Sequence, residues 1–263
     1  MVISAPQITR FLQDGAVTLD TPFTTDQVQA AAAVFDRIVP AAPPDAKGQQ
    51  RFRTSTTCSF FDPELVDLIQ HPFLEEVAQG VLDAKDVRFL QTAALATYPQ
   101  PPGPFTFDQH IDLQYTRADL EASPRRIVCT FFLWLSDVTA SRAPLMYRSG
   151  SHLPLADCWQ SQPGLQQHLP RVIGIPLADL PALEYGDPHP LLARAGQATV
   201  LTTAMVHGAS VNLDSSPRKA LVVTFTARGV TVALPPAQQD AKDAYEAGLA
   251  LQLRPERRHI LAA

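Results

Sequence analysis

A histidine and an aspartate stand at the spacing of a metal site in residues 107–115, where His110 and Asp112 are two positions apart. In an extended strand, residues i and i+2 point to the same face, so both side chains would offer a donor atom to one ion. A third ligand must come from elsewhere, and His207 follows a second β-rich segment, residues 199–206. Two imidazoles and one carboxylate on one side of an ion leave its other positions open, which suits non-haem Fe(II). The sequence therefore predicts a metal site made of His110, Asp112 and His207.

Each of these features is weak alone, because an HxD tripeptide arises by chance and most histidines have no ligand role. Arg218 strengthens the combination, since it follows His207 by eleven residues across the turn-rich linker 211–217. If the two flanking strands pair as antiparallel neighbours, His207 and Arg218 lie close together on one face. A guanidinium there would bind a carboxylate. A molecule that chelates the metal at one end and carries a carboxylate at the other fits this geometry, and 2-oxoglutarate has that shape.

Composition limits the classes of partner. The chain has 263 residues, of which 46% are hydrophobic and 18% charged, and its net charge is −5 with no cluster of Lys and Arg. We expect a single domain over residues 1–263 that binds a small-molecule substrate and no nucleic acid. The first residues do not resemble a signal peptide, and no apolar run is long enough for a membrane helix. We therefore expect a cytoplasmic protein, monomeric or homodimeric, without a membrane partner.

The order of predicted elements indicates an α+β fold with a mainly β core. Helices are predicted at residues 8–15, 25–39, 62–69 and 71–82, and a last one at 237–253. Strands are predicted at residues 16–19, 87–98, 127–135, 172–176, 198–202 and 219–227, with shorter ones between them. The segment 127–135 is apolar on both faces and is expected to be a central strand. Helices followed by at least eight strands point to a barrel or sandwich.

Several of these motifs together resemble one family, the phytanoyl-CoA dioxygenase-like branch of the Fe(II)/2-oxoglutarate dioxygenases. His110-Ile111-Asp112, the Leu-Trp-Leu-Ser-Asp stretch at 133–137, Gly-Ser-His at 150–152, His207 and Arg218 follow the family's order. The resemblance implies a double-stranded β-helix, a cupin-like jelly roll, with the N-terminal helices packed outside it. It also implies Fe(II), 2-oxoglutarate and O2 as cofactor and co-substrates, with the iron near one mouth of the barrel and Arg218 binding 2-oxoglutarate.

Two positions depart from the family pattern. Ser149 stands where a proline usually precedes Gly-Ser-His, and Ala220 stands where a Ser or Thr often follows the closing arginine. The second contact to the 2-oxoglutarate carboxylate would then come from Thr130 or Gln91. Gln91 is also the polar residue most expected to reach the substrate.

The resemblance implies oxidation of an unactivated C–H bond of a small metabolite, such as a secondary metabolite, an amino acid or a lipid-like molecule. Related halogenases replace the carboxylate ligand by a small residue, so Asp112 favours hydroxylation. The alternatives are desaturation, epoxidation or rearrangement by the same iron chemistry, a non-catalytic jelly-roll binding protein, and a zinc hydrolase in which Arg218 has no evident role.

Two further sets of residues have both a functional and a structural interpretation. Ser151 and His152 are interpreted as a turn whose side chains bind backbone groups. Six other residues could line the substrate pocket by their position, although an aromatic core or a solvated arginine is an equally good explanation: Phe105, Phe107, Tyr115, Arg117, Trp159 and Arg228.

Overall fold

A computed structural model describes residues 2–40, 53–100, 109–161 and 171–261 of the chain. The helices are α1 (Ala5–Asp14), α2 (Thr25–Ile38), α3 (Pro63–Ile69), α4 (Pro72–Leu82), α5 (Arg117–Glu121), α6 (His152–Ser161) and α7 (Pro236–Gln252), with 3-10 helices η2 (Leu177–Asp179) and η3 (Pro255–Leu261). The strands are β1 (Ala16–Leu19), β2 (Arg53–Thr57), β3 (Val87–Thr97), β4 (His110–Gln114), β5 (Val128–Trp134), β6 (Leu145–Tyr147), β7 (Arg171–Pro176), β8 (His189–Leu191), β9 (Ala198–Leu201), β10 (His207–Gly208) and β11 (Arg218–Ala227).

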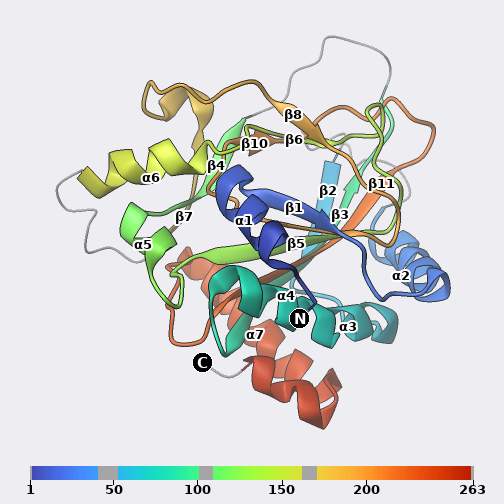
Figure 1. Cartoon of the computed structure of the whole chain (residues 1–263). Helices are drawn as coiled ribbons and strands as arrows, with labels where there is room; N and C mark the ends of the chain where they lie inside the picture. Colours follow the sequence, from blue (N-terminus) through green and yellow to red (C-terminus); the bar gives the residue numbers. More distant parts are fainter. Residues whose placement is uncertain (1, 41–52, 101–108, 162–170, 262–263) are drawn as a thin grey trace.

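The strands form two antiparallel sheets. The larger sheet has the order β1-β9-β5-β11-β3-β2, and the smaller one has the order β7-β4-β10-β6-β8. Strands far apart in the sequence alternate within each sheet, as in a jelly roll. The predicted fold, a double-stranded β-helix with N-terminal helices packed outside, is confirmed. Figure 1 shows α3, α4 and α7 on one side of the larger sheet and the smaller sheet on the other.

The larger sheet separates an apolar core from the interior of the jelly roll. All residues of β5 are buried, as expected for a strand that is apolar on both faces. On the side that faces α4, Phe225 packs edge-to-face against Phe89 and Phe131, with ring centroids 6.2 and 6.0 Å apart. The opposite face of the same strands lines a cavity between the sheets. The site is therefore built on strands held rigid by packing on their far side.

The N-terminal helix ends in close contact with the segment before β10 and with the start of α6. Gly15 follows α1 with φ of 87°, and its N–H donates to the Phe11 carbonyl at 2.9 Å. A Cβ at this position would lie 2.8 Å from Met205 Sδ and 3.2 Å from His152 Nδ1. Both the left-handed backbone and the close approach require glycine here. The predicted stop of the first helix at Gly15 is thereby explained.

Ser151 and His152 bind backbone groups, as predicted. Ser151 Oγ accepts a hydrogen bond from the Val206 N–H at 2.8 Å, and His152 Nε2 lies 3.1 Å from the Leu12 carbonyl oxygen. Both side chains are buried. They connect the start of α6 to the segment before His207 and to α1, so they have a structural role.

Some elements were not predicted. Residues 53–57 form the edge strand β2, and the residues after the Gly-Ser-His turn continue as α6. The segment of β2, Arg-Thr-Ser-Thr-Thr, lacks apolar alternation, so its strand state comes from pairing with β3. No helix in the described part of the chain has the length and apolar character needed to cross a membrane.

The buried His152 predicts a pH dependence of stability. Burial lowers the pKa of His152 to about 4, from an ordinary value of 6.5. Between these values the unfolded chain binds a proton that the folded chain does not. The contribution of the neutral His152 to the free energy of unfolding is therefore fully present above pH ~6.5. It is lost as the pH drops toward 4, by up to about 3 kcal/mol. Urea unfolding of His152→Gln should show a smaller loss of free energy between pH 7 and pH 5 than the wild type, whereas the exposed His189→Gln should behave as wild type. Equal slopes for His152→Gln and wild type would contradict this account.

Candidate metal centre

Two strands of the smaller sheet bring the predicted ligands together. His207 in β10 is the register partner of His110 in β4, and on its other side it pairs with Tyr147 in β6. Asp112 is two residues further along β4, on the same face as His110. One strand therefore carries two of the predicted ligands, and its neighbour carries the third at the adjacent position.

The donor atoms of these three residues converge. His110 Nε2 lies 3.2 Å from Asp112 Oδ1, and His207 Nε2 lies 3.7 Å from Asp112 Oδ2. One donor atom from each residue lies within 4.8 Å of the other two. Neighbouring ligands at about 2.1 Å from a metal ion are roughly 3 Å apart, so small adjustments would let all three bind one ion.

Backbone hydrogen bonds orient two of the ligands. The His207 Nδ1 lies 2.9 Å from the Met205 carbonyl oxygen, a pairing that places the proton on Nδ1 and leaves Nε2 free to bind a metal. The Asp112 N–H donates to the Thr203 carbonyl at 2.9 Å, where the register of β4 with β7 is irregular. Both orienting carbonyls belong to the segment between β9 and β10, so that segment sets the geometry of the centre.

The charges at the centre favour the protonation states that metal binding needs. Burial would raise the pKa of the Asp112 carboxyl, but the hydrogen bond from His110 and the charges of His207, His110 and Arg53 hold it below its ordinary value. Burial lowers the pKa of His207. Asp112 is thus an anion and His207 is neutral at pH 7, as ligands must be.

Arg218 at the start of β11 is buried, and it forms no ion pair with an acidic residue in the part of the chain that the structure describes. Its Nη2 donates to Thr97 Oγ1 at 2.7 Å, and its guanidinium carbon lies 5.4 Å from the centre of the Trp134 ring. Nε and Nη1 are buried and have no hydrogen-bond partner among the described residues. Burial lowers the pKa of Arg218 to about 9, so it still carries its charge at pH 7. A buried cation with free donors is suited to bind an anionic ligand.

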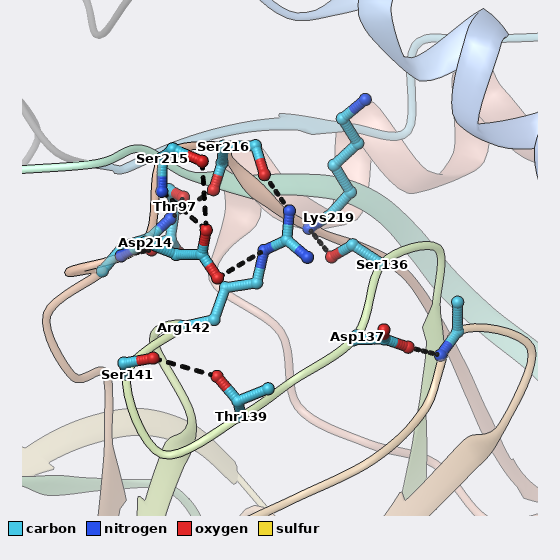
Figure 2. Close-up of polar contacts among 12 residues, drawn as sticks. Thr97, Ser136, Asp137, Thr139, Ser141, Arg142, Asp214, Ser215, Ser216 and Lys219 are labelled. Carbon is cyan, nitrogen blue, oxygen red and sulfur yellow. Dashed lines mark hydrogen bonds and ion pairs between the residues drawn. The ribbon is translucent and has the colours of Figure 1, made fainter.

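A polar network fixes the start of β11 (Figure 2). Arg142 reaches from the segment before β6 to Ser216 Oγ and to Asp214, whose Oδ2 is 3.9 Å from its Nε. The buried Asn212 donates from Nδ2 to the carbonyls of Thr97 and Ser216, both at 2.9 Å. The loop before Arg218 is therefore tied to β3, the strand that carries the threonine partner of Arg218.

The expected pairing of the His207 and Arg218 strands is wrong. β10 pairs with β4 and β6 in the smaller sheet, whereas β11 pairs with β3 and β5 in the larger one. Residues 209–217 thus connect the two sheets and do not form a hairpin. His207 and Arg218 belong to opposite walls of the jelly roll.

A cavity of about 510 Å³ opens between the sheets beside Asp112. Its lining includes Gln91 and Thr130, which were predicted to contact a bound ligand, together with the apolar Leu95, Phe132 and Val222. Asp112 keeps 41% of its side-chain surface accessible because it lines this cavity, whereas His207 keeps 7%. The volume is that of a small-molecule site.

The structure does not bring Gln91 or Thr130 to Arg218. Both are in register with Thr224, six residues from Arg218 along β11. Six residues of a strand span about 20 Å, which is too far for a shared carboxylate. Thr97 takes the place beside Arg218 instead, and it supplies the hydroxyl that Ala220 lacks.

The residues proposed by position as pocket lining do not line the cavity, as far as they are described. Tyr115 is buried and accepts the Val128 N–H at 2.8 Å. Trp159 packs in an apolar cluster, Arg117 pairs with Asp157, and Arg228 donates to a backbone carbonyl. Phe105 and Phe107 lie outside the described residues.

Two residues of the site were missed by the sequence analysis. Thr97 is on the same strand and face as Gln91, so the two-residue period of that strand could have identified it. Arg53 is in the strand β2, which was not predicted, and nothing in the residue pattern distinguished it from a solvated arginine. Both depend on the pairing of β3 with its two neighbours.

Comparisons with known proteins identify a family and a shared fold. The model of the family "Phytanoyl-CoA dioxygenase (PhyH)" matches residues 11–220. No curated protein sequence matches the chain.

Solved structures share the fold at low identity. SnoK, an α-ketoglutarate-dependent carbocyclase from nogalamycin biosynthesis, is 21% identical with a TM-score of 0.62, over 86% of this chain and 84% of that one. The epimerase SnoN, solved with Fe³⁺, α-ketoglutarate and nogalamycin RO, is 16% identical with a TM-score of 0.62, over 84% and 82%. EctD from S. alaskensis, solved with 2-oxoglutarate and 5-hydroxyectoine, is 23% identical with a TM-score of 0.59, over 88% and 78%.

We expect that removing the carboxylate of Asp112, a predicted ligand, lowers the affinity of the protein for a metal ion. Asp112→Ala deletes the group that faces both histidines, so the Kd for Co(II), followed by its visible absorption, should rise at least about 100-fold. His189→Gln, a histidine outside the centre, should bind Co(II) as the wild type does. Unchanged Co(II) affinity in Asp112→Ala would exclude Asp112 as a ligand.

Proposed function

The chain belongs to the phytanoyl-CoA dioxygenase family, and from this premise we propose that His110, Asp112 and His207 hold Fe(II) and that Arg218 binds 2-oxoglutarate. The protein is a 2-oxoglutarate-dependent dioxygenase that uses iron and acts on a small molecule. The observation that carries the assignment of residues is the convergence of one carboxylate and two imidazoles opposite a buried arginine with unused donors.

The residues present fit both groups. The three converging donors are of the type that binds Fe(II) with positions left open. The donors of Arg218 suit the far carboxylate of 2-oxoglutarate, and the hydroxyl of Thr97 stands beside them. Trp134 holds the guanidinium from one side, while its own Nε1 donates to Thr199 at 2.9 Å. The arginine is therefore preorganised before the ligand arrives.

Bound iron, with 2-oxoglutarate and O2, supplies the oxidising power for an unactivated C–H bond, with release of succinate and CO2. The protein positions the reacting groups and excludes water from the space around them. Asp112 and the two histidines would hold the ion, and the apolar side chains of Leu95, Phe132 and Val222 would exclude water from the cavity beside it. Gln91 and Thr130 are placed at the part of the cavity remote from Arg218, where they would hydrogen-bond the substrate.

We propose hydroxylation as the outcome because Asp112 occupies the position that would have to be vacated for a halide ligand. Desaturation, epoxidation and rearrangement would use the same centre, and product mass separates them, since hydroxylation adds an oxygen atom and desaturation removes two hydrogens. The proposal includes a cytoplasmic enzyme, monomeric or homodimeric, in one domain without nucleic-acid or membrane partners.

The proposal is tested by titrating Fe(II)-loaded protein with 2-oxoglutarate without oxygen, and then admitting air. A visible charge-transfer band should appear on titration and decay as succinate forms. If iron binds and no band appears, the co-substrate site is absent and the proposed function is refuted.

The same titration measures the effect of replacing Arg218. Arg218→Met should raise the Kd for 2-oxoglutarate at least about 30-fold, the lower end of the ~2–5 kcal/mol expected when one partner of a buried charged pair is lost. Fe(II) affinity should stay the same. The matched control is Lys219→Met, which removes a cation from the next residue, paired with Asp36 at 2.5 Å. A 2-oxoglutarate Kd that is equal in both variants would reject Arg218 as the binding residue.

A further inference from the structure

A second arginine lies in the same row of the larger sheet as Arg218. Thr97 in β3 is the register partner of Arg218 on one side and of Arg53 in β2 on the other. Residues directly opposite in antiparallel strands point to the same face, so all three side chains project toward the interior of the jelly roll. The charge of Arg53 acts on the carboxyl of Asp112, on His207 and on Arg218.

Arg53 has no protein partner among the described residues: no hydrogen bond or ion pair within 4.0 Å is formed by its side chain there. It is exposed, and it lines the cavity beside Asp112. Protein atoms nonetheless surround the guanidinium closely enough that desolvation lowers its pKa, while Asp112 acts in the opposite direction. Arg53 is thus a cation that lines the cavity and remains accessible to solvent, with donors available to a ligand.

The position of Arg53 assigns it to the substrate and not to 2-oxoglutarate. The cavity lining includes Arg53 and Asp112 but neither Arg218 nor Thr97. Arg218 is buried, with unused donors for the far carboxylate of the co-substrate, and the metal binds the other end. Both ends of 2-oxoglutarate therefore have partners without Arg53, which stands at the accessible end of the row.

The charges lead to the same assignment. Among the described residues of the site, Arg53 and Arg218 supply two positive charges and Asp112 supplies one negative charge. A divalent ion would balance the two carboxylates of 2-oxoglutarate. One positive charge is then unbalanced among these groups, in a space that loses its water when a substrate enters. An unpaired charge in such a place is costly unless the ligand supplies its partner. A group with a single negative charge, such as a carboxylate, would meet this need and would match the fork of the guanidinium.

We propose that the substrate is a small carboxylic acid whose carboxylate binds Arg53. This inference rests on the proposed function and deepens it. The carboxylate is held near Asp112, the apolar body lies against Leu95, Phe132 and Val222, and polar groups further along meet Gln91 and Thr130. Arg53 is then a specificity-determining residue, because it selects acids over their neutral analogues.

The test measures binding and needs no turnover. Protein loaded with Mn(II) and saturating 2-oxoglutarate is titrated with 3-phenylpropionate, indole-3-acetate and hexanoate, and with the neutral amide of each acid. Broadening of the probe's proton NMR signals by Mn(II) reports binding near the metal, and Zn(II)-loaded protein gives the baseline. At least one acid should bind the wild type ~10-fold or more tightly than its amide, as expected for a hydrogen-bonded ion pair.

Arg53→Met should abolish the preference for the acid, and Arg53→Lys should keep part of it. The matched control Arg194→Met, at an exposed arginine paired with Asp20, should keep it in full. The Kd for 2-oxoglutarate in Arg53→Met should stay within about threefold of wild type, since its contacts are with Arg218 and the metal.

Three results would overturn the inference: equal binding of acids and amides by the wild type, a preference that survives in Arg53→Met, or a tenfold or greater rise in the 2-oxoglutarate Kd of that variant. The last result would assign Arg53 to the co-substrate. If the wild type binds neither Mn(II) nor 2-oxoglutarate, the proposed function itself fails, and the inference fails with it.

Discussion

One rung of the smaller sheet determines the architecture of the site. His207 opposite His110 joins a strand of two residues to a strand nearly a hundred residues earlier in the chain. β10 is too short to be held by its own ladder, so it depends on its neighbours and on the segment before it. The side chain of Ser151 and the carbonyls of Met205 and Thr203 supply that support. A register error between β10 and β4 would separate the two imidazoles even if the rest of the fold formed correctly.

The interior is organised by charge as much as by shape. Arg53 and Asp112 line a cavity whose walls are largely apolar, and Arg218 is buried in the same row of the larger sheet as Arg53. Among the described residues of the site, cations are therefore in excess until ligands enter. Trp134 and Thr97 stabilise Arg218 only in part, and its remaining donors stay unused. Fixed, partly desolvated donors of this kind bind anions well, because they need no reorganisation when the anion arrives. Ligands that bind in the cavity therefore stabilise the folded protein.

The sequence predicted what local periodicity controls. The alternation around His110 and Asp112 correctly placed both on one strand face, and the doubly apolar segment around Phe131 correctly became a central strand. It could not predict which strands become neighbours. A turn-rich linker before Arg218 looks like a hairpin, but Asn212 ties it to β3 and carries the chain to the other sheet. Arg53 was not predicted as a site residue for the same reason. Its side chain points toward the interior because its short polar strand pairs with β3.

The sheet order also bears on how the chain is synthesised. β11 is synthesised after all the other described strands, yet it lies between β5 and β3. Among the described strands, β1 pairs with β9 alone. A nascent chain that ends before residue 218 therefore holds β5 and β3 as separate edges with exposed backbone donors and acceptors. Long-range pairing of this kind forms slowly and leaves apolar strands open to association during translation. The larger sheet can therefore close only after β11 has been synthesised.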